Sequence, residues 1–82
     1  EIKVMNPFST SLRISIITGT PEKISLNLYD IGGRKALPVR NIESANGESI
    51  IFMNCTSISP GLYILKIISP SISYETRVVK SE

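Results

Sequence analysis

Two stretches with apolar side chains at every second position constrain the fold of this chain more than any other feature. They are residues 11–18, SLRISIIT, and residues 23–30, KISLNLYD. Successive side chains of a β-strand point to opposite faces, so a period of two predicts strands with one buried face. Both stretches are rich in β-branched residues, which suit a pleated sheet. Because no segment shows a sustained helical period, the sequence predicts an all-β protein.

Turn signals recur between the apolar stretches. Residues 18–23 (TGTPEK) carry a glycine and a proline, residues 30–35 (DIGGRK) carry a Gly-Gly pair, and Asn46-Gly47 is the strongest short hairpin dipeptide. A turn about every 8–12 residues is typical of a β-sandwich. We therefore predict a small antiparallel immunoglobulin-like β-sandwich of about seven strands. The predicted strands are 2–5, 11–18, 23–30, 34–40, 49–55, 61–69 and 72–80.

The length of 82 residues predicts a single domain. A chain of this size buries only about 60% of its unfolded surface, which is near the lower limit for independent folding. The chain begins with Glu1 instead of Met, so we expect residues 1–82 to be one domain cut from a longer secreted polypeptide. No apolar stretch approaches the roughly 18 residues of a membrane span, and no signal peptide is present. An export signal is expected upstream.

The run ESIIFMNC is apolar on both faces, which predicts a strand covered on both sides. Ile51, Met53 and Cys55 are expected to face the core, so Ile50 and Phe52 need cover elsewhere. Cys55 is the only cysteine and no histidine is present to activate it, so we expect a buried, unreactive thiol. The predicted core includes Ile14, Ile16, Leu26, Leu28, Met53, Tyr63, Leu65 and Val78.

The residues needed for common catalytic and ligand sites are missing. Without histidine there is no catalytic triad, imidazole base or histidine metal site. Most of the seven acidic residues fall in turns or at the ends, not as an inward-facing pair. The segment IGGRK lacks the spacing of a phosphate loop. We predict no enzyme activity, metal, cofactor or small-molecule substrate. The triplet NCT at residues 54–56 matches a glycosylation acceptor, but we expect it to be partly buried and the match to be chance.

The net charge of +2 does not indicate a nucleic-acid partner. The densest basic group, Arg34, Lys35 and Arg40, has no interleaved aromatic residues on which bases could stack. We interpret it as the solvated end of a hairpin.

Four segments resemble, in order and spacing, the C-terminal sorting domain of the type IX secretion system, over essentially the whole chain. VMNPFSTSLRISI looks like the opening of that family, and ISLNLYDIGGRKA is similar to its central hairpin. GESIIFMNCTSISPGLYILKI resembles the part in which Gly, an aliphatic residue and Tyr open the penultimate strand, and ETRVVK resembles the closing strand. Met5, Gly32 and Cys55 depart from the usual family residues.

The resemblance implies a non-catalytic sorting signal. An outer-membrane translocon and its sortase-like processing machinery would read the domain, export an N-terminal passenger through the periplasm and outer membrane of a Gram-negative bacterium, and usually remove the domain. The passenger would be secreted or held at the cell surface. Tyr63 is interpreted as structural in preference to a direct contact, whereas Arg34 and Lys80 are the candidates expected to be exposed. The positions that match the family motifs are Pro7, Gly33, Arg34, Gly61, Tyr63 and Lys80.

Two alternatives remain open at this stage. An immunoglobulin-like spacer or adhesion module of a large surface protein predicts the same fold, but more chain would follow it. The chain stops two residues after Lys80, which is what a natural C-terminus would give. A carbohydrate-binding module is less favoured, because such modules stack sugars on exposed aromatics and this chain has three tyrosines and no tryptophan.

Overall fold

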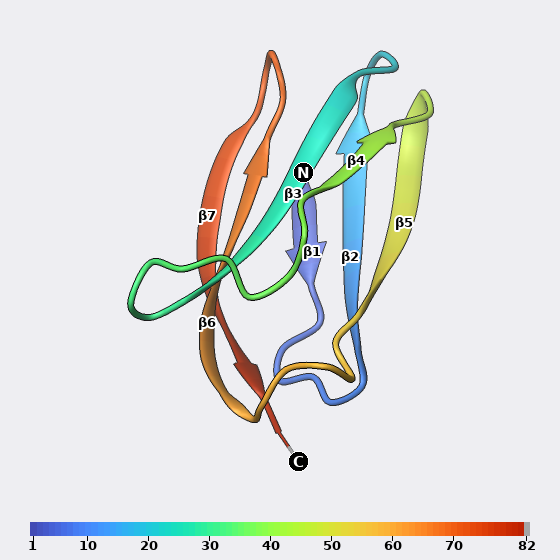
Figure 1. Ribbon diagram of the computed structural model, residues 1–82. Coiled ribbons are helices and arrows are strands. Elements are labelled where there is room, and N and C mark those ends of the chain that lie inside the picture. The colour runs from blue at the N-terminus through green and yellow to red at the C-terminus, as the bar shows by residue number, and fades with distance from the viewer. Residues whose placement is uncertain (82) are drawn as a thin grey trace.

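The computed structural model describes residues 1–81, in which seven strands form two packed sheets (Figure 1). Glu82, the last residue of the predicted domain, lies outside the described residues. The sheets have the strand orders β1-β2-β5 and β4-β3-β6-β7, and every strand pair is antiparallel. The strands are β1 (Ile2–Val4), β2 (Ser11–Thr18), β3 (Lys23–Asp30), β4 (Arg40–Glu43), β5 (Gly47–Asn54), β6 (Gly61–Ile68) and β7 (Ser73–Lys80).

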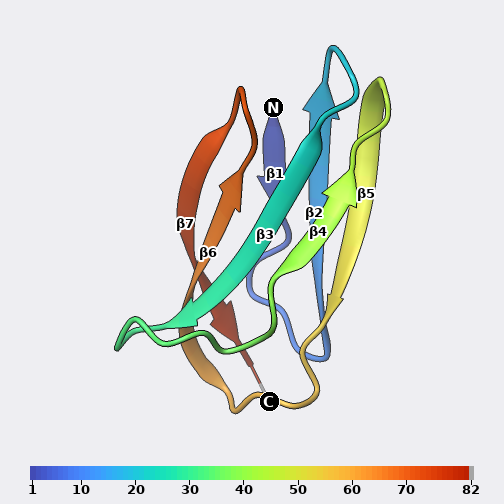
Figure 2. The same ribbon diagram turned by 45° about the horizontal axis from the view of Figure 1, so that its top comes forward.

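The strand order confirms the predicted immunoglobulin-like sandwich. Constant-type immunoglobulin domains pair strands A, B, E and D in one sheet and C, F and G in the other. Here β1, β2 and β5 take the places of A, B and E, while β3, β6 and β7 take those of C, F and G. The fourth strand differs, because it pairs with β3 in the larger sheet. Figure 2 shows β4 beside β3, with β5 in the other layer.

The predicted fourth strand, 34–40, is wrong. Residues after the Gly-Gly turn do return along β3, since Lys35 pairs with Tyr29 and the Ala36 N–H donates to the Leu28 carbonyl at 2.8 Å. The next pair is Arg40 with Leu26. Between the two pairs the returning segment advances five residues, whereas β3 advances only three. The excess chain bulges out where Pro38 has no N–H to donate. Regular pairing resumes only at β4.

The predicted hairpin at Asn46-Gly47 is also wrong. Gly47 has a positive φ of 109°, as such a turn requires, but β4 and β5 belong to different sheets. The turn therefore carries the chain across the sandwich. Buried Ser44 anchors the crossing, because its hydroxyl accepts from the Glu22 N–H at 3.0 Å and lies 3.2 Å from the Thr18 hydroxyl.

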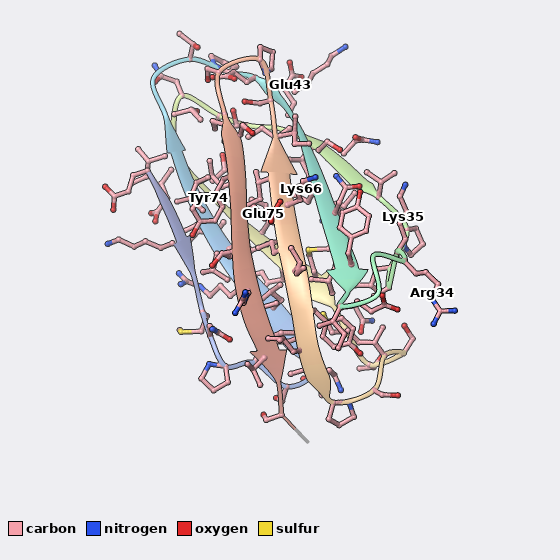
Figure 3. The ribbon with its side chains drawn as sticks, turned by 90° about the vertical axis from the view of Figure 1, so that its left-hand side faces the viewer. Arg34, Lys35, Glu43, Lys66, Tyr74 and Glu75 are labelled. Atoms are coloured by element: carbon pink, nitrogen blue, oxygen red, sulfur yellow. The ribbon has the colours of Figure 1, made fainter. Side chains whose placement is uncertain are left out.

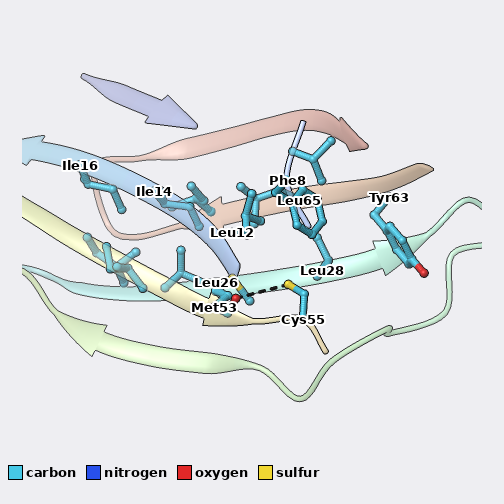
Figure 4. Packing of buried hydrophobic residues seen from close by; sticks show 14 residues of the cluster. Phe8, Leu12, Ile14, Ile16, Leu26, Leu28, Met53, Cys55, Tyr63 and Leu65 are labelled. Atoms are coloured by element: carbon cyan, nitrogen blue, oxygen red, sulfur yellow. Dashed lines mark hydrogen bonds between the residues drawn. The ribbon is translucent and has the colours of Figure 1, made fainter. Parts of the chain in front are cut away.

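The core fills the space between the sheets, and all eight predicted core residues are buried in it (Figure 4). The prediction that β5 is covered on both sides is wrong within residues 1–81, because Ile50 and Phe52 are 45% and 56% exposed. Residues 54–56 are partly buried, as expected, because Cys55 is buried while Asn54 and Thr56 are exposed. The full buried apolar cluster is Phe8, Leu12, Ile14, Ile16, Ile24, Leu26, Leu28, Ile51, Met53, Cys55, Tyr63, Leu65, Ile67 and Val78.

Candidate recognition surface

The antiparallel topology places four segments toward one end of the sandwich: in Figure 1 three of them lie at the bottom of the view, and the green loop after β3 projects sideways above them. The end of β3 lies beside the start of β6, because Asp30 pairs with Tyr63. The end of β7 lies there too, because Lys80 pairs with Gly61. We call this region the lower end and define it as residues 5–10, 31–39, 55–60 and 80–81. All six candidate recognition residues lie in it or at the strand ends that border it.

The Asn-Pro-Phe segment holds the end of β7. The Asn6 side-chain oxygen accepts from the Val79 N–H at 2.8 Å, and the Phe8 N–H donates to the Val79 carbonyl at 3.0 Å. The Ser81 N–H then donates to the Phe8 carbonyl at 2.7 Å. Phe8 is buried in the core and forms a parallel bridge with Lys80. Pro7, which is exposed between Asn6 and Phe8, is thus fixed beside the last strand.

Gly33 and Arg34 occupy a tight turn organised by Asp30. One carboxylate oxygen of Asp30 accepts from the Gly32 and Arg34 N–H groups at 2.9 and 3.0 Å. Gly33 has a φ of +88°, which favours glycine, and its N–H donates to the Asp30 carbonyl. The Arg34 side chain is 89% exposed, with Nε 3.7 Å from Asp30. Figure 3 shows Arg34 and Lys35 extending from this turn away from the sheet.

Gly61 and Tyr63 form a tyrosine corner. In immunoglobulin domains, a tyrosine near the start of strand F donates its hydroxyl to the backbone a few residues upstream. Here the Tyr63 hydroxyl donates to the carbonyl of Ser59, and the side chain is only 8% exposed. Gly61, between them, has a φ of +152°, which non-glycine residues rarely adopt. This geometry accords with the structural interpretation of Tyr63.

At the lower end, Lys80 lies at the edge of the core and Cys55 lies inside it. Lys80 is half-buried, so it is less exposed than Arg34. Burial raises the pKa of the Cys55 thiol, a rise that a backbone hydrogen bond from Leu12 and the charge of Lys80 partly oppose. The thiol donates to the Met53 carbonyl at 3.4 Å (Figure 4). Cys55 is therefore a buried apolar residue in surroundings that disfavour its thiolate.

Two kinds of feature are absent from the described part of the chain. Residues 1–81 contain no group of three His, Cys, Asp or Glu side chains that could hold a metal ion. They also contain no helix long and apolar enough to cross a membrane. At the opposite end, Glu22 accepts hydrogen bonds from Ser71 and Ser69, which lower its pKa. That carboxylate ties the turn between β6 and β7 to the turn before β3.

Sequence reasoning missed Asn6, Phe8 and Asp30, which shape the lower end. Asn6 and Phe8 flank Pro7, and Asp30 precedes the two turn glycines. An Asp or Asn that starts a turn often binds nearby backbone N–H groups, so that signal was available for Asp30. No local signal indicates that Asn6 binds a strand that lies 73 residues away in sequence.

The comparisons with known proteins give one match. The family model for the secretion system C-terminal sorting domain matches residues 6–81. No curated protein matches the chain, and no solved structure matches it. The matched region begins at Asn6 and includes every segment of the lower end after Met5.

Proposed function

The chain belongs to the secretion system C-terminal sorting domain family, and from this membership we propose that the lower end of the sandwich is the surface that the export machinery reads. The domain is a C-terminal sorting signal for the type IX secretion system. Family members are non-catalytic, and the proteins that carry them are exported to the medium or the cell surface. The immunoglobulin-like spacer is not favoured, because the family match covers nearly the whole chain.

The observation that carries the proposal is the convergence of distant motif segments at one end. Pro7, Arg34, Gly61 and Lys80 come from four separate parts of the sequence. The pairing of Gly61 with Lys80 and the bridge of Phe8 to Lys80 bring three of these parts together. A folded signal needs a surface that exists only in the folded state, and this end provides one.

Within this surface we assign two kinds of role. Gly33, Gly61 and Tyr63 shape the turns, because two have positive φ angles and the third is buried. Pro7 is held against the last strand by its neighbours. Arg34 and Lys80 supply the charged contacts, and Arg34 is the stronger candidate since its side chain is 89% exposed.

The proposed route places the passenger on the other side of the domain. The Glu1 amino group donates to the Ile17 carbonyl at 3.1 Å, near the upper end of β2. A passenger joined before Glu1 would therefore leave the lower end free for the outer-membrane translocon and its sortase-like processing machinery. Residues 1–82 would then be the last domain of a protein that crosses the periplasm before it reaches the outer membrane.

The assignment of Arg34 and Lys80 is tested by export of a fusion protein. The domain is fused to the C-terminus of a passenger that already enters the periplasm, in a host with type IX machinery. The double variant Arg34→Ala/Lys80→Ala should retain most of the passenger in the periplasm. The matched control Arg77→Ala removes an exposed cation from β7 outside this surface, and it should be exported normally. Equal export of the unaltered fusion, the double variant and the Arg77→Ala control would refute the assignment.

A further inference from the structure

The two sheets have four edge strands, and β5 is the one left long and unprotected among residues 1–81. β1 and β4 have three and four residues, while β7 carries three charged residues and is partly covered by Asn6 and Phe8. β5 has eight residues, GESIIFMN, with no proline or lysine. Proteins normally blunt such edges, because exposed backbone groups pair with other chains. Figure 2 shows β5 at the margin of the fold.

The outward-facing backbone groups of β5 can be identified. The Met5 N–H donates to the Arg13 carbonyl, so Arg13 directs its backbone toward β1 and away from its β5 partner, Phe52. The backbone of Phe52 therefore faces the open edge, as does that of Ile50 two residues earlier. Arg40 confirms this direction, since its guanidinium donates to the Phe52 carbonyl at 2.9 Å. No other hydrogen bond within the described residues occupies this edge at Ile50 or Phe52.

Apolar surface lies on both sides of the same edge. Ile50 and Phe52 are exposed on the outer face, in line with the open backbone groups. On the inner side is a cavity of about 120 Å³ lined by Leu37, Pro38, Arg40, Met53 and Asn54. The side chains of an added strand alternate between two faces. One row would cover Ile50 and Phe52, and one aliphatic side chain of the other row would fill the cavity.

We propose that the β5 edge binds an extended segment of an export-machinery protein as an additional strand, and that this segment alternates apolar residues with at least one carboxylate. The carboxylate is needed because two arginine side chains lie beside the edge. Arg13 lies directly opposite Phe52, and Arg40 occupies the carbonyl that an incoming N–H would take. Displaced from that carbonyl, Arg40 is free to pair with a carboxylate. This inference rests on the proposed sorting function, since it names a contact of the same domain with the same machinery.

Peptide binding tests the chemistry without any export. The probe is a synthetic eight-residue peptide that alternates valine with threonine and glutamate, added to the folded domain. At about ten times its Kd, it should slow amide hydrogen exchange at Ile50 and Phe52 by about tenfold. A backbone N-methylated peptide should give no protection, and a peptide with lysine in place of glutamate should bind more weakly. Unchanged exchange at millimolar peptide, or protection of the β6–β7 face instead, would overturn the proposal.

Export tests the role of the edge in the fusion described above. Ile50→Pro removes an outward N–H without breaking the β2–β5 ladder, so it should fold but leave the passenger periplasmic. Ile50→Ser should reduce export, whereas the matched control Ile68→Ser, at a site 44% exposed, should not. If the wild-type fusion and both Ile50 variants are exported equally, the edge proposal fails alone. If the wild type itself stays periplasmic, the proposed function fails, and the peptide experiment still decides the edge. If the isolated domain forms dimers and Ile50→Pro makes it monomeric, the edge binds a second copy of the domain and the proposal is refuted.

Discussion

Replacing Tyr63 with phenylalanine removes one hydroxyl group from the tyrosine corner and leaves the buried ring in place. The lost interaction is the hydrogen bond to the Ser59 carbonyl. A hydrogen bond between uncharged groups contributes about 0.5–1.5 kcal/mol net. Because Ser59 is exposed, its carbonyl can bind water in the variant, so the cost should lie near the middle of that range. A loss of about 1 kcal/mol lowers the Tm of a domain of this size by about 4–8 °C.

Urea denaturation of both proteins, followed by circular dichroism, measures this difference. The matched control is Tyr74→Phe, since Tyr74 is half-buried against the core and makes no hydrogen bond through its hydroxyl within residues 1–81. That variant should change the free energy of unfolding by less than about 0.5 kcal/mol. The m-value should stay constant in both. If Tyr63→Phe costs no more than Tyr74→Phe, the hydroxyl does not stabilise the corner and the structural assignment of Tyr63 is wrong.

Three further predictions concern the core, the turn and the thiol. Leu26→Ala should cost about 2–5 kcal/mol in urea denaturation, because Leu26 is fully buried; a cost below about 1 kcal/mol would contradict that packing. Gly61→Ala should cost about 1–3 kcal/mol because of its φ of +152°, whereas Gly19→Ala, at an ordinary φ with open space around it, should be near neutral; equal effects would refute the turn argument. Cys55 should react slowly with a thiol probe until denaturant is added. Rapid labelling of the folded protein would show that the thiol is exposed and not buried in the core. Its pKa is raised above the ordinary 9.0 in the folded state, so its contribution to stability is present below pH 9.0 and is lost as the pH rises through the folded pKa. Cys55→Ala should lack this part of the alkaline decline.

Sequence periodicity predicted the strands whose patterns are local. β2 and β3 begin and end at the predicted residues, because their alternation and flanking turns are both contained in the sequence. β4 was misplaced because its start depends on where the returning chain leaves β3, and that register is a property of the pair. The turn at Asn46-Gly47 crosses between the sheets instead of forming the predicted hairpin, for a similar reason. A dipeptide specifies a turn but does not specify which sheet the next strand joins.

The turns of the candidate site could be predicted from the sequence, but the long-range contacts that bring its segments together could not. Gly33 and Gly61 were marked by turn motifs, and each has the positive φ that explains the glycine. The contact of Asn6 with Val79 joins the two ends of the domain, and no periodicity reports such a pair. The exposure of Ile50 and Phe52 contradicts the apolar pattern of β5 taken as a core signal. Both side chains lie along the proposed binding edge.

Export of a passenger by the intact domain measures whether residues 1–82 act as a sorting signal. The passenger already enters the periplasm, carries residues 1–82 at its C-terminus, and is expressed in a host with type IX machinery. We expect passenger in the medium or on the cell surface, and periplasmic passenger when residues 73–82 are deleted, because that deletion removes β7 and Lys80. If the intact fusion stays periplasmic while another sorting domain exports the same passenger, residues 1–82 are not a sorting signal in that host.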